Sequence, residues 1–172
     1  GGLNLSLYPR ETASHPEIDY GIIGEGIKAI PALLSALEYG DAPENIPGLI
    51  YKKEGKVIIN PEDEGHIDLD DYPFPARHLL PNEAYYSFIS QLKNFTIMVT
   101  STGCPFRCSF CAIHPNTKYR TRSPKNVVDE IELCYKEFHV REIDFFDATF
   151  FIDKPRMSEI FGEIRKRRLN IE

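Results

Sequence analysis

The sequence predicts an α/β protein in two parts, and three observations carry this prediction. In residues 1–60 a short apolar run is followed by helical spacing and then by a hairpin pattern. Residues 61–93 begin with an acidic, proline-rich stretch that cannot continue a helix and is expected to serve as a linker. In residues 94–172 apolar segments alternate as strand, helix, strand, helix, which indicates parallel βαβ units.

The first part is expected to contain a strand, a helix and a hairpin. The apolar run 19–24 predicts a buried strand. A helix is expected to begin at Pro31, which suits a first helical position, and to end before Gly40. Two apolar runs, 49–51 and 57–59, flank a charged turn that contains a glycine, which predicts a β-hairpin. The inward face of the helix is expected to carry three leucines: Leu33, Leu34 and Leu37.

Gly24 and Gly26 lie in the turn between the predicted strand and helix. Two glycines in such a turn allow the backbone to approach a ligand phosphate or nucleotide tail closely. The same pair also occurs where only a tight turn is needed. Both residues are therefore candidates for cofactor binding, and both interpretations stay open on the sequence alone.

The second part is expected to begin with a strand at 95–100 and a long loop that ends at Ser123. Ser123 suits a helix N-cap, and the proline that follows suits the first helical position. A second strand is expected at 142–147, and a last helix after Asp153. The inward faces of the two helices are expected to be Val127, Val128, Ile131, Cys134, Tyr135 and Phe138 in the first, and Met157, Ile160, Phe161 and Ile164 in the second.

The composition of the chain limits the classes of partner that it is expected to bind. The 172 residues carry a formal net charge of −6 and a sequence pI near 5.4, so no overall field attracts nucleic acid or an anionic membrane. No run approaches the roughly 18 apolar residues of a membrane helix, and no signal-peptide pattern opens the chain. We expect a cytoplasmic protein without nucleic-acid or membrane partners.

Cys104, Cys108 and Cys111 form a C-x3-C-x2-C run directly after the predicted strand. Three close thiolates can hold three corners of a [4Fe–4S] cluster and leave one iron open to a ligand. With His114, the same cysteines would also suffice for a closed Cys3His zinc site. The position after a strand of a βαβ unit favours the iron–sulfur interpretation, and Cys134 is expected to be a core residue.

This stretch resembles the radical S-adenosylmethionine (SAM) superfamily, whose signature has these spacings and an aromatic residue before the last cysteine, here Phe110. The resemblance implies that Cys104, Cys108 and Cys111 bind the cluster and that the open iron binds SAM. SAM cleavage would then give a deoxyadenosyl radical that takes hydrogen from a small-molecule substrate. It also implies that Phe110 contacts the adenine and Asp147 the methionine part, and that flavodoxin or ferredoxin supplies the electron.

Further landmarks resemble the cobalamin-dependent members of this superfamily. They are Gly1-Gly2, residues 19–26, the run Pro73–Arg77 and the run Tyr119–Pro124. The resemblance implies that 1–60 is the C-terminal part of a Rossmann-like cobalamin-binding domain with an appended hairpin. Residues 94–172 would be the first βα units of a partial TIM-type barrel, about two of about six. Gly24 and Gly26 would lie on the cobalamin side, and the reaction would be methyl transfer or ring formation.

Three functions of different classes stay open on the sequence. The chain is part of a radical enzyme, or a truncated and inactive cluster-binding protein, or a zinc-binding interaction module. Arg120 and Arg122 steer an anionic ligand, solvate a loop, or lie against the loop that holds the cysteines. The basic run 165–168 is expected to be the solvated face of the last helix.

Overall fold

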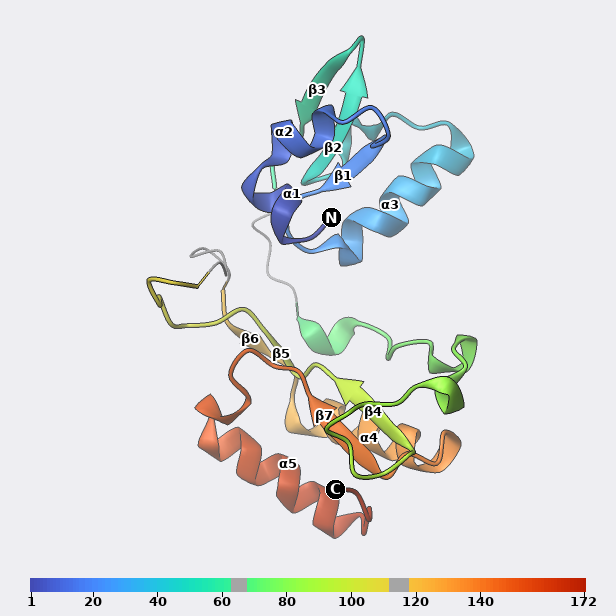
Figure 1. The fold of residues 1–172 in the computed structure, drawn as a ribbon, viewed down its shortest axis with the longest axis vertical. Helices are drawn as coiled ribbons and strands as arrows, with labels where there is room; N and C mark the ends of the chain where they lie inside the picture. The colour runs from blue at the N-terminus through green and yellow to red at the C-terminus, as the bar shows by residue number, and fades with distance from the viewer. Residues whose placement is uncertain (63–67, 112–117) are drawn as a thin grey trace. The chain divides into compact units, whose positions relative to one another are not determined.

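The computed structural model describes residues 1–62, 68–111 and 118–172, and it divides the chain into two compact units, Gly1–His66 and Ile67–Glu172 (Figure 1). Both units mix helices with short strands, which confirms the predicted α/β class. Within the described ranges the strands form no closed barrel, as expected for a partial one. None of the helices in these ranges has the length and apolarity needed to cross a membrane.

The first unit contains a three-stranded antiparallel sheet in the order β1-β2-β3: β1 is Tyr20–Ile22, β2 is Leu49–Lys53 and β3 is Lys56–Ile59. Strands β2 and β3 form the predicted hairpin, with Lys53 paired to Lys56. Glu54 and Gly55 between them have φ of 51° and 73°, the left-handed pair that a two-residue hairpin turn requires. The hairpin prediction is confirmed.

Helix α3, Gly26–Tyr39, differs from the prediction in its start and in its buried face. It begins at Gly26, so Pro31 lies inside the helix, where the missing N–H removes one backbone hydrogen bond. Ala29 and Ala36 are its buried residues, and Leu33 is partly buried against them. Two of the three leucines that were expected inside, Leu34 and Leu37, are 61% and 53% exposed. The predicted end is confirmed, because Gly40 caps the helix at φ 75°.

Two short helices, α1 (Leu3–Leu7) and α2 (Pro9–Ser14), precede β1 and were not predicted. Each supplies one buried residue to a small apolar cluster with β2, formed by Leu5, Ala13 and Ile50. Helices of five and six residues are too short to show a helical period in the sequence. A 3-10 turn at Pro43–Asn45 connects α3 to β2.

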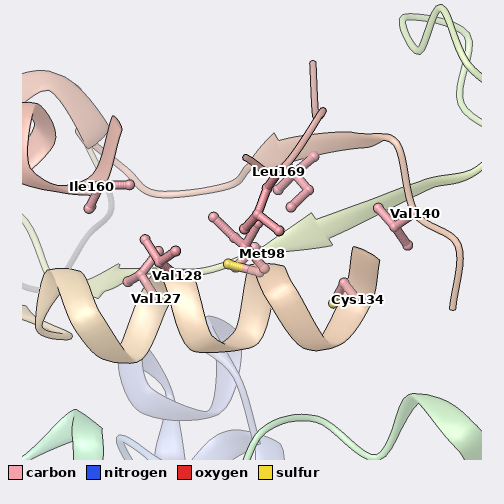
Figure 2. Close-up of a cluster of buried hydrophobic side chains, with 9 residues drawn as sticks. Met98, Val127, Val128, Cys134, Val140, Ile160 and Leu169 are labelled. Atoms are coloured by element: carbon pink, nitrogen blue, oxygen red, sulfur yellow. The ribbon is translucent and has the colours of Figure 1, made fainter. Parts of the chain in front are cut away.

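The second unit is built on two parallel strands, β4 (Phe95–Met98) and β7 (Glu142–Phe145), with helix α4 (Pro124–Glu137) as their crossover. Helix α5 (Lys154–Lys166) follows β7. This strand, helix, strand, helix order confirms the predicted βαβ pattern. The core between strands and helices is shown in Figure 2 and comprises Met98, Val127, Val128, Ile131, Cys134, Val140, Ile143, Ile160 and Leu169.

The starts of both helices follow the sequence signals. The Ser123 hydroxyl accepts a hydrogen bond from the Asn126 amide at 3.1 Å, and the Asp153 carboxylate accepts one from the Arg156 amide at 3.0 Å. The predicted inward face of α4 is confirmed. In α5 Ile160 is fully buried, whereas Phe161 remains 39% exposed and meets Phe150 edge to face.

Residues 68–93 belong to the second unit and contain three 3-10 turns: Leu69–Asp71, Arg77–Leu79 and Asn82–Ala84. Arg77 in this segment is buried beneath strand β4 and helix α4. A further 3-10 turn, Phe150–Ile152, precedes α5. Two strands of two residues each, β5 (Ser101–Thr102) and β6 (Arg120–Thr121), pair with each other at the two ends of the cysteine-containing loop.

Candidate active site at the end of strand β4

The three cysteines lie on a loop that leaves the carboxyl end of β4 and returns through β6. Strands β5 and β6 pair antiparallel, with Ser101 opposite Thr121 and Thr102 opposite Arg120, so the residues that flank the segment 103–119 lie side by side. Gly103 has φ 75°, a left-handed conformation that other residues adopt only with strain. We call residues 103–119 the cluster loop.

Cys104, Cys108 and Cys111 are all free thiols on this loop. Cys104 is half-buried with its Sγ 3.9 Å from the Thr149 Oγ1, and Cys108 and Cys111 are exposed. The Cys111 amide donates a hydrogen bond to the Cys108 carbonyl at 3.0 Å, so the last two cysteines share one turn. Soft thiolate donors that are free of disulfides fit an iron–sulfur cluster in chemistry and number.

The thiols do not converge on a common point. Among the described residues, no group of three His, Cys, Asp or Glu side chains has the geometry to hold a metal ion. His114, the fourth ligand of the zinc alternative, lies outside the described residues. The choice between iron–sulfur and zinc therefore rests on the ligand set and on the position of the loop. The three ligand assignments stay predictions.

Asp147 follows β7 and is turned toward the start of the cluster loop. Its carboxylate accepts hydrogen bonds from the Thr100 amide at 2.9 Å, from the Thr100 hydroxyl at 3.1 Å and from the Ser101 hydroxyl at 2.5 Å. These donors belong to the chain itself. The carboxylate thus ties the ends of the two parallel strands together, and its predicted contact with the methionine part of SAM stays a prediction.

Phe110, the predicted adenine contact, lies between the last two cysteines and is 91% exposed. An aromatic ring this exposed gains little from folding, since burial of apolar area is what stabilises it. Its position on the loop leaves the ring free to stack on a ligand. The role assigned to Phe110 stays a prediction.

Arg122 neither steers a ligand nor solvates a loop, and it lies at the end of the cluster loop, where its guanidinium donates to the Val99 carbonyl. Its guanidinium is 11% exposed and forms an ion pair with Glu130, which is 1% exposed. Arg77 binds the other carboxylate oxygen of Glu130 at 2.5 Å and also donates to the Ile97 carbonyl at 3.2 Å. A buried carboxylate between two guanidinium groups joins α4, the segment before β4 and the end of the cluster loop.

Arg156 is a residue that the sequence analysis missed. It is 6% exposed at the N-terminal end of α5, and burial lowers the pKa of its guanidinium. Its Nε donates to the Arg122 carbonyl at 2.9 Å and its Nη2 to the Thr100 carbonyl at 3.0 Å. A signal was present in the sequence, because Arg156 stands four residues before Ile160, on the face that was expected to be apolar. Glu130 shows the same signal four residues before Cys134.

In the first unit, Gly24 and Gly26 lie where β1 ends and α3 begins. Gly24 has φ 74°, and its amide donates to the Ser6 hydroxyl at 3.4 Å. A Cβ on Gly26 would lie 2.8 Å from the Ile30 Cδ1, so a side chain there would crowd the helix start. Gly1 lies beside the same strand end, with its Cβ position 3.7 Å from the Ile22 carbonyl. The structure thus brings the two glycine landmarks together, and their role in cofactor binding stays a prediction.

Comparison with known proteins identifies the second unit. The family model described as the Radical SAM superfamily matches residues 98–172. Over 99% of its length the chain is 33% identical to an uncharacterized methyltransferase of Pyrococcus horikoshii, covering 37% of that protein. It is 34% identical, again over 99% of its length, to an anaerobic magnesium-protoporphyrin IX monomethyl ester cyclase of Rubrivivax gelatinosus, covering 32% of it. The chain spans about a third of these curated relatives.

Solved structures share the fold. The radical SAM methyltransferase TsrM of Kitasatospora setae, solved with cobalamin and a [4Fe–4S] cluster, matches 98% of this chain and 33% of its own, at TM-score 0.68 and 24% identity. The cobalamin-dependent radical enzyme OxsB, solved with aqua-cobalamin and SAM, matches 100% of this chain and 24% of its own, at TM-score 0.75 and 19% identity. Residues 98–172, which include the three-cysteine loop at the end of a parallel strand, thus match the radical SAM superfamily, and the relatives of the chain include a protein named as a cobalamin-dependent radical SAM methyltransferase.

Proposed function

We propose that this chain carries the cluster-binding portion of a radical SAM enzyme. The supporting observation is the position of three free cysteines on one loop at the carboxyl end of β4, beside the parallel strand β7. In parallel α/β barrels the active site lies at this end of the strands. Cys104, Cys108 and Cys111 would hold a [4Fe–4S] cluster through three of its irons.

The cofactors would supply the chemistry: one electron from the reduced cluster cleaves a C–S bond of SAM, giving methionine and a deoxyadenosyl radical that abstracts hydrogen from the substrate. The chain's own residues bind and orient. The thiolates fix the cluster on the loop, and the exposed Phe110 ring is placed to stack on the adenine. Asp147 is placed beside the same loop, although its carboxylate oxygens already accept three hydrogen bonds from the strand end.

We further propose that the first unit contributes to a cobalamin site. The turn at Gly24 and Gly26 precedes the first amides of α3, a 14-residue helix, and helix N-termini with small residues suit the phosphate of a nucleotide tail. Relatives named as methyltransferases and cyclases make methyl transfer or ring formation on a small molecule the proposed reaction of the whole protein. A flavodoxin or ferredoxin would donate the electron, in the cytoplasm.

The test is anaerobic reconstitution with iron and sulfide, followed by electron paramagnetic resonance (EPR) of the reduced protein with and without SAM. The control is the triple variant Cys104→Ala, Cys108→Ala, Cys111→Ala. We expect a cysteine-dependent [4Fe–4S] signal that changes when SAM is added. A cluster that SAM does not perturb would instead indicate a truncated cluster-binding protein, and a colourless protein with one bound zinc would end the radical-enzyme proposal.

A further inference from the structure

The two ends of the cluster loop meet at one point, which we call the neck and define as Thr100, Arg122 and Arg156. The Thr100 carbonyl accepts a hydrogen bond from the Arg122 amide at 2.9 Å and from the Arg156 Nη2 at 3.0 Å. The Arg156 Nε donates to the Arg122 carbonyl at 2.9 Å. One guanidinium from α5 therefore holds a residue before the loop and a residue after it.

The burial of this guanidinium is costly, which points to a specific role. Arg156 is 6% exposed, and its side chain donates hydrogen bonds to two neutral carbonyls, while the Asp147 and Asp153 carboxylates act on it through their charge. A buried charge that lacks a bound partner carboxylate costs more than the hydrogen bonds alone return. An apolar side chain at this position would pack on the core at lower cost, but it would leave both carbonyls without this donor.

The opposite side of Thr100 is held by Asp147. Its carboxylate accepts hydrogen bonds from the Thr100 amide and hydroxyl and from the Ser101 hydroxyl, so Thr100, three residues before the loop, is fixed from β7 as well as from α5. Thr100 is fully buried and Ser101 is 4% exposed. Cys104 follows within four residues, so the position of its thiol depends on this fixed point.

We propose that Arg156 is a positioning residue that sets the separation of the two ends of the cluster loop and thereby the placement of the three cysteine thiols. This inference rests on the proposed function, because the loop's task is taken to be cluster binding. Arginine suits the task through its planar fork, which presents two N–H groups at fixed separation to two carbonyls. A lysine ammonium has no such fixed pair and reproduces the arrangement only in part.

The test compares three variants of the full chain: Arg156→Gln, Arg156→Lys and, as a matched control, Arg167→Gln. Arg167 is the C-cap of α5, at the opposite end of the helix from Arg156, and it binds Asp129, Glu132 and Glu163. In the cluster-free protein, amide hydrogen exchange across 98–102 and 120–123 reports the neck directly. We expect the exchange rate of these amides to be about tenfold higher in Arg156→Gln than in the parent, and unchanged in the control.

The second readout is the rate at which the reconstituted protein loses iron to a chelator, together with its EPR response to SAM. We expect Arg156→Gln to lose iron about tenfold faster than the parent and Arg156→Lys to fall between them. Equal iron loss in Arg156→Gln and Arg167→Gln, or faster exchange without faster iron loss, would overturn the proposal. If the parent holds no cysteine-dependent cluster, the proposed function fails, and the positioning role fails with it even where the exchange result stands.

Discussion

The cluster loop and the neck beneath it differ in how their polar groups are satisfied. At the neck, Thr100 is fully buried and Arg156 is 6% exposed, and every contact described above joins groups of this chain. On the loop, Phe110 is 91% exposed and two of the three cysteines are exposed free thiols. The buried residues of the neck thus stabilise the fold, and the exposed residues of the loop are left free to bind a ligand. Substitutions beneath the loop should act through stability and through the placement of the loop, and substitutions on the loop should act directly on cofactor binding.

The largest effect on folding is expected at Glu130, which lies between Arg77 and Arg122. Glu130→Ala leaves two buried guanidinium groups without their carboxylate partner, so we expect a loss of about 3–5 kcal/mol in the free energy of unfolding. Urea denaturation of the cluster-free protein measures it. The matched control is Glu132→Ala, two residues further along α4, whose side chain is 28% exposed and pairs with Lys136 and Arg167. Similar losses in both variants would show that the buried carboxylate contributes no more to stability than the more exposed one.

Cys134 is fully buried in the core cluster of the second unit. Burial raises the pKa of Cys134 from 9.0 to about 11. A raised pKa in the folded state means that its contribution to stability is complete below pH 9 and is lost as the pH rises toward 11. Between pH 8.5 and about pH 11, the free energy of unfolding of the parent should therefore fall by about 2 kcal/mol more than that of Cys134→Ala.

The check on Cys134 is the difference in unfolding free energy between the two proteins at each pH. The alanine variant also loses packing, but that loss is independent of pH and appears as a constant offset. A difference that stays constant from pH 8.5 to 11 would contradict the prediction. The same burial predicts that Cys134 stays unreactive toward thiol reagents while Cys108 and Cys111 react.

Much of the second unit could be predicted because its signals are local. Ser123 as N-cap and the Val127–Cys134 face follow from spacing along one helix, and the three cysteines follow from spacing along one loop. The neck could not be predicted this way, since Arg156 and Thr100 are 56 residues apart. In the first unit the leucines of α3 misled the prediction, because alanines at Ala29 and Ala36 let the helix approach its sheet closely and left bulkier residues outside.

A smaller effect is expected at Arg167, which binds three carboxylates at the surface of α4 and α5. Arg167→Gln should cost at most about 1 kcal/mol at neutral pH, the usual range for exposed ion pairs. Its hydrogen bond lowers the pKa of Glu163 below 4.5, so the stabilisation is present above that value and is lost as the pH falls. The gap between parent and variant should therefore close in acid and shrink in high salt; a gap that persists in both would contradict an electrostatic origin.

The smallest effect on folding is expected at Phe110, where a substitution should change ligand binding and leave stability unchanged, the reverse of what is expected at Glu130. Because the ring is 91% exposed, Phe110→Ala should leave the denaturation midpoint of the cluster-free protein unchanged. The same substitution should weaken SAM binding to the reconstituted protein by about tenfold or more, as expected for loss of a base-stacking ring.

The control is Phe106→Ala, on the same loop and 57% exposed, for which no ligand contact is expected. Titration of the SAM-dependent EPR change measures both variants. Equal weakening in the two would assign the effect to the loop as a whole, and unchanged binding in Phe110→Ala would remove the ring from the adenine site while leaving the cysteines' role intact.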